Sequence, residues 1–294
     1  MNCKDVVKNI RQELEDYIIE HKLQSLIIGI SGGIDSTLCA ALARPVCDCL
    51  HISLIGRSIP IATNSEVEIQ RAALTGVAFC HDFKEIDLSH TYRQIAPIIV
   101  DDYDTADHSD VAFKIRLGNL KARMRMIKLY DLAAQNKGMV LSTDNYTEFL
   151  LGFSTIMGDW GDYGMIQHLW KTEVYEISKF ILKNMLLDEK QIESLKLCIE
   201  AVPTDGLGVS NSDLDQLGAP TYDDVDKILK CWIMTENNYL TNIDAITEQR
   251  DRLKDHPVVQ RYLKANFKRH WPISISRTAL FKKINFKRHW PISK

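Results

Sequence analysis

The segment from residue 29 to residue 37, G-I-S-G-G-I-D-S-T, has the composition of a phosphate-binding loop. Glycines let the backbone approach an anion with no Cβ atom in the way, and N–H groups that lead into a helix N-terminus attract phosphate. Asp35 would repel a phosphate unless a cation lay between them. Its presence therefore indicates Mg²⁺, which takes carboxylate and phosphate oxygens as ligands. The alternative is a glycine-rich helix cap without a ligand.

We favour phosphate binding because S-G-G-I-D-S at 31–36 directly follows the apolar run 25–30. It has neither the lysine of the kinase-type loop nor the glycine spacing of a dinucleotide fingerprint. The residues that we expect to contact the phosphates, called the phosphate loop below, are Gly29, Ile30, Ser31, Gly32, Gly33, Asp35 and Ser36.

The elements that must position this loop alternate between strands and helices. Apolar runs predict strands at 25–30, 49–55, within 77–86 and at 139–143. Helical spacing predicts helices at 4–23, 64–76, 115–135, 171–184, 188–199 and 222–232, from 37 to 43, and around 245–264. Residues 202–219 lack periodicity and are predicted to form a long loop.

This alternation predicts an α/β fold with a doubly wound, mostly parallel sheet flanked by helices. Ligands of such sheets bind beyond the carboxyl ends of the strands. The phosphate loop and Thr143 both fall at such ends.

Composition and charge exclude several classes of protein. The 294 residues carry a formal net charge of −3, so we expect no nucleic-acid partner. No apolar run reaches the length of about 18 residues that a membrane helix needs, and the N-terminus lacks an apolar signal core. Seven scattered cysteines fit no zinc motif. We therefore expect a cytoplasmic protein with reduced thiols and no membrane association.

The C-terminal region contains a perfect repeat. The nine residues N-F-K-R-H-W-P-I-S occur at 266–274 and again at 285–293. Two copies do not make a repeat architecture, so we interpret the second as a duplicated tail. The predicted organisation is a single domain over residues 1–275, followed by a tail at 276–294.

The phosphate loop resembles that of the PP-loop ATP pyrophosphatases, and further segments are similar to those of the NAD synthetase family. In chain order, these segments are G-N-L-K-A-R-M-R-M at 118–126, S-T-D-N-Y-T-E at 142–148, G-F at 152–153, G-D-W-G-D at 158–162, L-W-K at 169–171, P-T at 203–204 and L-G with Y-D-D-V-D between 217 and 226. The similarity runs from about residue 5 to residue 272. It implies an adenine nucleotide alpha hydrolase-like fold.

The resemblance also implies an ammonia-dependent enzyme that binds ATP, Mg²⁺ and deamido-NAD and acts as a homodimer, with the deamido-NAD site at the subunit interface. By position, ATP contacts fall on the phosphate loop and on Thr143, Lys171 and Thr204; Mg²⁺ ligands are Asp35 and Glu148; deamido-NAD contacts are Arg123, Asp162 and Lys268; catalytic residues are Asp159 and Lys171. Asp162 matches the family's second acidic residue only if a gap precedes it. Otherwise Tyr163 takes that place.

The implied reaction is the amidation of a carboxylate. Transfer of AMP to the carboxylate creates a good leaving group, which ammonia then displaces. The protein must position the reactants and stabilise phosphate charge. Lys171 and the metal suit that charge, whereas Asp159 or Asp162 could orient ammonia or accept its proton.

Two departures from the family pattern leave alternatives open. Ile156 stands where the family has a substrate-contacting lysine, and Phe267 stands where it has a histidine. A related acceptor, such as another carboxylate or a tRNA uridine, is therefore one alternative. A non-catalytic nucleotide-binding dimer is another, although Asp35, Glu148 and Lys171 are all present. No glutaminase segment precedes residue 25, so we expect ammonia rather than glutamine as nitrogen donor.

Overall fold

A computed structural model describes residues 1–62, 64–203, 213–236, 248 and 250–269 of the chain. It contains a five-stranded sheet in the order β3-β2-β1-β4-β5, with every neighbouring pair parallel. The strands are β1 (Ser25–Gly29), β2 (Ser53–Ser58), β3 (Asp82–Glu85), β4 (Gly138–Ser142) and β5 (Tyr163–Gly164). The order reverses at β1, which pairs with both β2 and β4, as expected for a doubly wound sheet.

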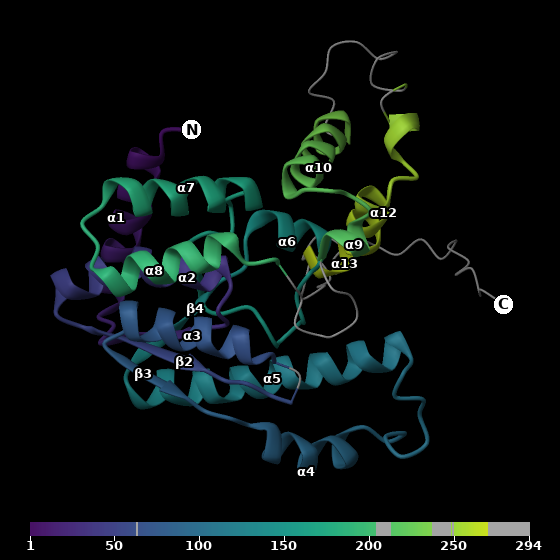
Figure 1. The fold of residues 1–294 in the computed structure, drawn as a ribbon, viewed down its shortest axis with the longest axis horizontal. Helices are drawn as coiled ribbons and strands as arrows, with labels where there is room; N and C mark the ends of the chain where they lie inside the picture. The colour runs from purple at the N-terminus through teal and green to yellow at the C-terminus, as the bar shows by residue number, and fades with distance from the viewer. Residues whose placement is uncertain (63, 204–212, 237–247, 249, 270–294) are drawn as a thin grey trace, which may run out of the picture.

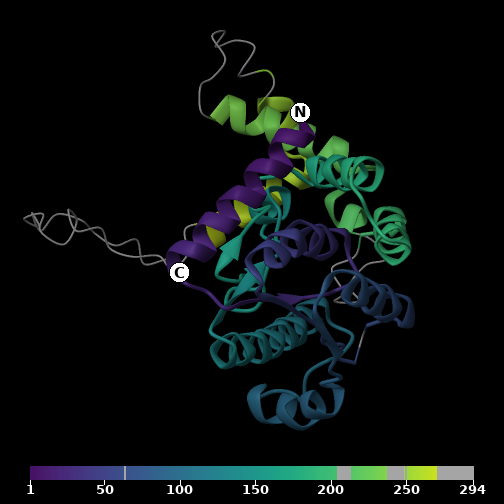
Figure 2. The same cartoon turned by 90° about the vertical axis from the view of Figure 1, so that its left-hand side faces the viewer.

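Helices cover both faces of this sheet (Figures 1 and 2). One face carries α1 (Cys3–His21), α2 (Ile34–Leu50), α3 (Glu66–Phe79), α7 (Lys171–Asn184) and α8 (Glu189–Glu200). The other carries α5 (Val111–Gln135), with α4 (Ser89–Ile99) packed on it. A third group adjoins them: α6 (Tyr146–Leu151), α9 (Asp213–Leu217), α10 (Tyr222–Glu236), α12 (Pro257–Lys264) and α13 (Asn266–Arg269).

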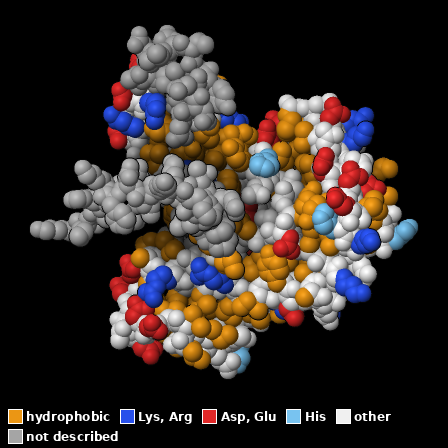
Figure 3. All heavy atoms as spheres, turned by 180° about the vertical axis from the view of Figure 1, so that it is seen from behind, with side chains coloured by type: hydrophobic (Ala, Val, Ile, Leu, Met, Phe, Trp, Pro, Cys, Tyr) orange, Lys and Arg blue, Asp and Glu red, His pale blue; other side chains and the backbone are white. Residues whose placement is uncertain are grey.

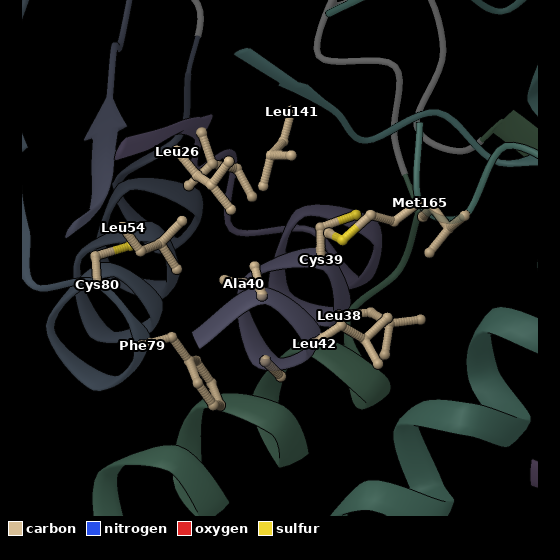
Figure 4. Close-up of a cluster of buried hydrophobic side chains, with 14 of the residues drawn as sticks. Leu26, Leu38, Cys39, Ala40, Leu42, Leu54, Phe79, Cys80, Leu141 and Met165 are labelled. Atoms are coloured by element: carbon tan, nitrogen blue, oxygen red, sulfur yellow. The ribbon is translucent and has the colours of Figure 1, made fainter. Parts of the chain in front are cut away.

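Alternation along the strands divides the core between the two faces. Leu26, Leu54 and Leu141 pack toward α2, as Figure 4 shows. Ile27 and Val140 belong to the cluster on the opposite face, which includes the buried side of α5. The central strands are therefore apolar on both faces, which explains why they appear in the sequence as continuous apolar runs.

Three predicted boundaries were wrong. Residues 49 and 50 end α2, and β2 begins only at Ser53. The prediction failed here because a short apolar run can belong either to a helix end or to a strand. Asp213–Leu217 forms α9 inside the predicted loop. The predicted helix around 245–264 is interrupted before α12, where His256 caps a helix that starts with Pro257.

Besides α9, the structure adds α4, α6 and the short α13, which the sequence analysis missed. In α6 a capping box joins Asn145 to Glu148: the Asn145 side chain accepts from the Glu148 N–H, and the Glu148 side chain accepts from the Asn145 N–H. Such reciprocal hydrogen bonds stabilise the start of even a short helix. None of the helices described is both long and apolar enough to cross a membrane.

Candidate active site

A cavity of about 480 Å³ lies at the carboxyl ends of β1, β2 and β4. The phosphate loop forms one wall, and α5 contributes another. The segment 152–159, together with residues of α12 and α13, closes a further side. The cavity therefore lies where the strand order reverses, which is the expected ligand position in an open parallel sheet.

The phosphate loop is held in one conformation by its own hydroxyl groups and by α3. The N–H of Gly33 donates to Ser31 Oγ (3.2 Å), and Ser36 Oγ donates to the carbonyl of Gly33 (3.2 Å). The carbonyl of Gly32 accepts from Arg71 Nε of α3 (3.0 Å). Gly32 has φ +79°, which favours glycine. These contacts leave the start of α2 open toward the cavity, as an anion site requires.

Three charged residues from three helix starts meet beside this loop. Lys171 Nζ lies 2.5 Å from Asp35 Oδ2 and 2.8 Å from Glu148 Oε1. Asp35 and Glu148 belong to the first turns of α2 and α6, and Lys171 is the first residue of α7. Asn145 Nδ2 donates to the other oxygen of Asp35 (2.8 Å). Residues separated by up to 136 positions thus form one constellation.

The electrostatics of this constellation follow from burial and from the two acids. Burial opposes the charge of Lys171, but Asp35 and Glu148 outweigh it and hold the pKa of the lysine well above its ordinary value. Burial, followed by the nearby Asp35, raises the pKa of Glu148 to about 8, although Lys171 counteracts the shift. An additional cation at the two carboxylates would relieve their repulsion.

Asp35 and Glu148 are the residues that could hold a metal ion. The part of the chain that the structure describes contains no group of three or more His, Cys, Asp and Glu side chains able to enclose a metal. Two carboxylates suit Mg²⁺, which usually binds one or two carboxylates and fills its remaining positions with water and substrate phosphates. The donor set therefore fits Mg²⁺ bound together with a nucleotide.

Two further carboxylates, Asp144 and Asp159, line the cavity. Asp144 is buried, and its Oδ2 accepts from Ser142 Oγ (2.8 Å). Burial, and next the charge of Asp159, raise the pKa of Asp144 to about 7. Asp159 Oδ2 accepts from the N–H of Thr155 (2.5 Å). Asp159 is accessible through the cavity, yet protein atoms surround it, and this desolvation raises its pKa.

Cationic side chains line the cavity as well. Lys121 and Arg125 lie one turn apart on α5. Arg125 donates to the carbonyl of Ile59 (2.9 Å) and to Asn64 Oδ1 (3.0 Å). Lys268 Nζ donates to two backbone carbonyls, those of residues 152 (2.8 Å) and 154 (2.5 Å). Burial lowers the pKa of both lysines. These three cationic side chains could pair with phosphate and carboxylate groups of a ligand in the cavity.

The structure separates the predicted site residues into two groups. The phosphate loop except Gly32, and with it Thr143, Glu148, Asp159, Lys171 and Lys268, lines the cavity. Gly32 lies behind the loop against α3. Arg123 and Asp162 do not line it. Thr204 lies outside the described residues.

Both outlying residues lie at the exposed side of α5. Arg123 is exposed, and its Nε donates to the carbonyl of Ile156 (3.3 Å). Asp162 Oδ1 accepts from the hydroxyl of Tyr130 (3.0 Å), and its Oδ2 accepts from the N–H of Val140 (2.9 Å). Of the two acids that the sequence left as alternatives, only Asp159 reaches the cavity.

Sequence reasoning missed Asp144, Lys121 and Arg125 as cavity residues. Signals for them exist: Asp144 follows Thr143 at a strand end, and Lys121 and Arg125 have the i, i+4 spacing of one helix face. Arg123, two positions from Arg125, must point about 200° away from it around the helix. The motif supplied both arginines, but only the packing of α5 shows which one lines the cavity.

Comparisons with known proteins identify the family of this chain. The family model described as NAD synthase matches residues 6–272. An NH(3)-dependent NAD(+) synthetase of Methanococcoides burtonii is 34% identical over 209 residues, which are 71% of this chain and 72% of the relative. One from Thermoplasma volcanium is 28% identical over 272 residues, 92% of this chain and 96% of the relative.

Solved structures share the fold. An NH3-dependent NAD synthetase from Campylobacter jejuni superposes with a TM-score of 0.62 at 21% identity, covering 94% of this chain and 100% of the other. An NMN synthetase from Francisella tularensis superposes with a TM-score of 0.70, also at 21% identity, covering 94% and 98%. At this level of identity the two structures support the α/β architecture.

Proposed function

The chain belongs to the NAD synthase family, and we propose that it is a ligase that uses ATP and ammonia to convert deamido-NAD into NAD, with AMP and pyrophosphate as the other products. The observation that carries this proposal is the bridge from Lys171 to Asp35 and Glu148 beside the phosphate loop. It holds one cation and two carboxylates together beside the loop that we propose binds the phosphates of ATP.

The first step activates the substrate carboxylate. A carboxylate oxygen of deamido-NAD attacks the α-phosphorus of ATP, and the bond to the β-phosphate oxygen breaks, so that pyrophosphate leaves. N–H groups of the phosphate loop and the first turn of α2 bind the phosphates. Lys171, fixed by two ion pairs, faces the charge that develops on the leaving pyrophosphate. Thr143 and Thr204 complete the proposed ATP contacts.

We assign Mg²⁺ to Asp35 and Glu148. When bound, the ion supplies Lewis-acid stabilisation of phosphate charge and a template for the triphosphate. The assignment is supported by the side chains of both residues, which are largely buried with 17% and 19% exposure but remain open to the cavity.

The second step forms the amide. Ammonia attacks the carbonyl carbon of the acyl adenylate, a proton leaves the nitrogen, and AMP departs with the bonding electrons. Asp159 is proposed to orient ammonia and accept the proton, because its carboxylate lines the cavity and desolvation raises its pKa above the ordinary value. Asp162 is less suited, because both of its oxygens already accept hydrogen bonds outside the cavity.

Binding of deamido-NAD is proposed to involve a homodimer. Lys268 lies in the cavity, but Arg123 and Asp162 lie at the exposed side of α5. Ile127 and Tyr130, which follow Arg123 at helical spacing, are also exposed, at 72% and 41%. Hydrophobic side chains gather over the region of α4 and α5 at the lower edge of Figure 3. A partner on this face would bring Arg123 and Asp162 into a shared site.

The decisive experiment measures NAD, AMP and pyrophosphate from purified protein with deamido-NAD, ATP, Mg²⁺ and ammonium. We expect equal amounts of the three products, and we expect far slower turnover when glutamine replaces ammonium. Asp35→Ala should reduce turnover by at least about a hundredfold, since one metal ligand and one lysine partner are lost.

A parallel assay replaces deamido-NAD with nicotinate mononucleotide, because one structural relative is an NMN synthetase and Ile156 departs from the family pattern. A higher kcat/KM for the mononucleotide would overturn the dinucleotide assignment. No AMP formation with either acceptor would overturn the proposed function as a whole.

A further inference from the structure

Asp226 of α10 is a fully buried carboxylate that lies outside the cavity. Its Oδ1 accepts from Thr147 Oγ1 (2.6 Å). Its Oδ2 accepts from both the N–H (3.0 Å) and the Oγ1 (2.7 Å) of Thr172. In the described part of the chain, Asp226 forms no ion pair with Lys, Arg or His. Three neutral donors from two other helices therefore converge on one buried acid.

A buried acid of this kind is not expected to stabilise the fold more than an apolar side chain of similar size would. Removing a carboxylate from water without a cationic partner is costly, and apolar groups of similar size often stabilise a protein as well or better. Part of the cost is offset here because Oδ2 lies at the N-terminus of α7, whose dipole favours negative charge. Asp226 therefore contributes something that an apolar side chain could not, namely three hydrogen bonds of defined direction.

The partners of Asp226 are the immediate neighbours of two active-site residues. Thr147 precedes Glu148 on α6, and Thr172 follows Lys171 on α7. One member of each pair faces Asp226, and the other forms the Lys171–Glu148 ion pair beside the cavity. Through Thr147 and Thr172, Asp226 is thus linked to both residues of that ion pair from outside the cavity.

A direct link completes the connection to Lys171. The N–H of Lys171 donates to Thr147 Oγ1 (2.9 Å), the same hydroxyl that donates to Asp226. One turn earlier on α10, the ring of Tyr222 lies 5.4 Å from Lys171 Nζ. α10 packs against α7, and both helices lie in the upper half of Figure 1. α10 therefore contacts the lysine side chain through Tyr222, and Asp226 is linked to the lysine N–H through the Thr147 hydroxyl.

We propose that Asp226 is a positioning residue for the amidation reaction: by binding Thr147 and Thr172 together, it holds Glu148 and Lys171 at the separation that the charged phosphates require. This inference rests on the proposed function. It adds α10 to the machinery of the site without any contact between Asp226 and a substrate.

The test compares steady-state kinetics and thermal unfolding of the full-length protein and of Asp226→Asn. The asparagine oxygen can still accept from Thr172, but its NH₂ group meets a hydroxyl that already accepts from Lys171, so the Thr147 proton loses its acceptor. Because small displacements of catalytic groups reduce rates strongly, we expect kcat at saturating ATP and deamido-NAD to fall on the order of ten- to a hundredfold. The KM values should change less.

Leu229→Ala is the matched control for packing. Leu229 is fully buried on the same helix but belongs to an apolar cluster, so the substitution should lower the unfolding temperature while leaving kcat within about twofold of the wild type. A fall in kcat that merely follows the unfolding temperature across Leu229→Ala and Asp226→Asn would overturn the inference.

Thr147→Val and Thr147→Ser supply a second test that remains valid if Asp226→Asn does not fold. Serine keeps the hydroxyl that links Asp226 to Lys171, whereas valine removes it at similar volume. We expect kcat to fall in Thr147→Val and to return most of the way in Thr147→Ser. Equal kcat in the two variants would refute the positioning role. An inactive wild type would instead refute the proposed function.

Discussion

At the scale of single residues, the cavity is unusual for the number of carboxyl groups whose pKa is raised. Burial raises the pKa of Glu148 to about 8 and that of Asp144 to about 7, and it also raises the pKa of Asp159. Raised pKa values are typical of functional sites, where a bound substrate or metal ion supplies the charge that balances the acids. In the absence of ligands, these acids make the free energy of unfolding depend on pH.

Asp144 allows this sensitivity to be measured. In the folded protein it keeps its proton up to about pH 7, whereas its ordinary pKa is 3.8. Between these values the folded state binds more protons than the unfolded state, so the free energy of unfolding must fall as pH rises. We expect Asp144→Asn to reduce the fall between pH 5 and pH 7, by on the order of 2 kcal/mol. Urea unfolding with EDTA and without ATP measures it.

Asp102→Asn serves as the control for this prediction. Asp102 lies on the surface, where Arg116 lowers its pKa, so it stays ionised throughout the same interval. The pH dependence of this variant should match that of the wild type. Identical slopes for Asp144→Asn and the wild type would show that Asp144 is already ionised at pH 5.

At the scale of elements, the chemistry depends on how helices begin. Asp35, Glu148 and Lys171 each lie in a first turn, and Asn145 both caps α6 and bonds Asp35. The two ion pairs of Lys171 and the hydrogen bond from Asn145 to Asp35 leave these side chains few accessible positions. The site is therefore rigid although it is assembled from three helices.

Gly32→Ala tests the rigidity of the phosphate loop. A Cβ at residue 32 would lie 2.5 Å from the carbonyl oxygen of Glu68 and 2.9 Å from the N atom of Ala72, both of which are backbone atoms of α3. The left-handed φ of +79° adds strain. We expect the KM for ATP to rise at least about tenfold, equivalent to roughly 1.4 kcal/mol of binding. Steady-state kinetics with varied ATP measures it.

Gly33→Ala is the comparison within the same loop. Gly33 has an ordinary φ of −92°, and its added Cβ would meet only Ser31 Oγ, at 3.3 Å. Its effect on the KM for ATP should be clearly smaller. If both variants raise the KM equally, contact of the loop with ATP, and not its support by α3, determines the effect.

At the scale of the whole molecule, the exposed side of α5 is the feature that a single chain leaves unexplained. Arg123, Ile127 and Tyr130 lie there, and Tyr130 holds Asp162. Apolar side chains beside predicted substrate contacts are typical of an interface between subunits. A symmetric pair of such faces would form two equivalent sites.

Ile127→Glu should separate the proposed dimer. Burying two carboxylates in a symmetric apolar contact is unfavourable, so the mass in solution should fall from twice the 33.6 kDa of one chain to about that of one chain. Deamido-NAD turnover should fall with it. Light scattering coupled to size-exclusion chromatography measures the mass.

Leu186→Glu is the corresponding control, since Leu186 is fully exposed between α7 and α8 and away from α5. It should change neither mass nor turnover. A wild-type protein that is monomeric at assay concentrations and still active would refute the shared site.

The local pattern of apolar runs and motif residues was sufficient to predict the sheet and to identify the family. The apolar runs predicted β1 and β4 because strands buried on both faces must be apolar throughout, and the phosphate loop was recognisable because its glycines and hydroxyls serve local backbone geometry. Thr143, Glu148 and Lys171 were identified by resemblance, residue by residue, and the structure places all three at the cavity. The tail at 276–294 and Thr204 stay predictions, since they lie outside the described residues.

Only the tertiary structure decided how these residues act together. The sequence offered two arginines on α5 and two aspartates after α6, and packing turned Arg125 and Asp159 toward the cavity and Arg123 and Asp162 away from it. Asp226 belongs to the Y-D-D-V-D segment, but its role could not be recognised in advance, because its partners lie 54 and 79 residues away. Burial and long-range hydrogen bonds arise from the folded arrangement of helices, and no local pattern in the chain encodes them.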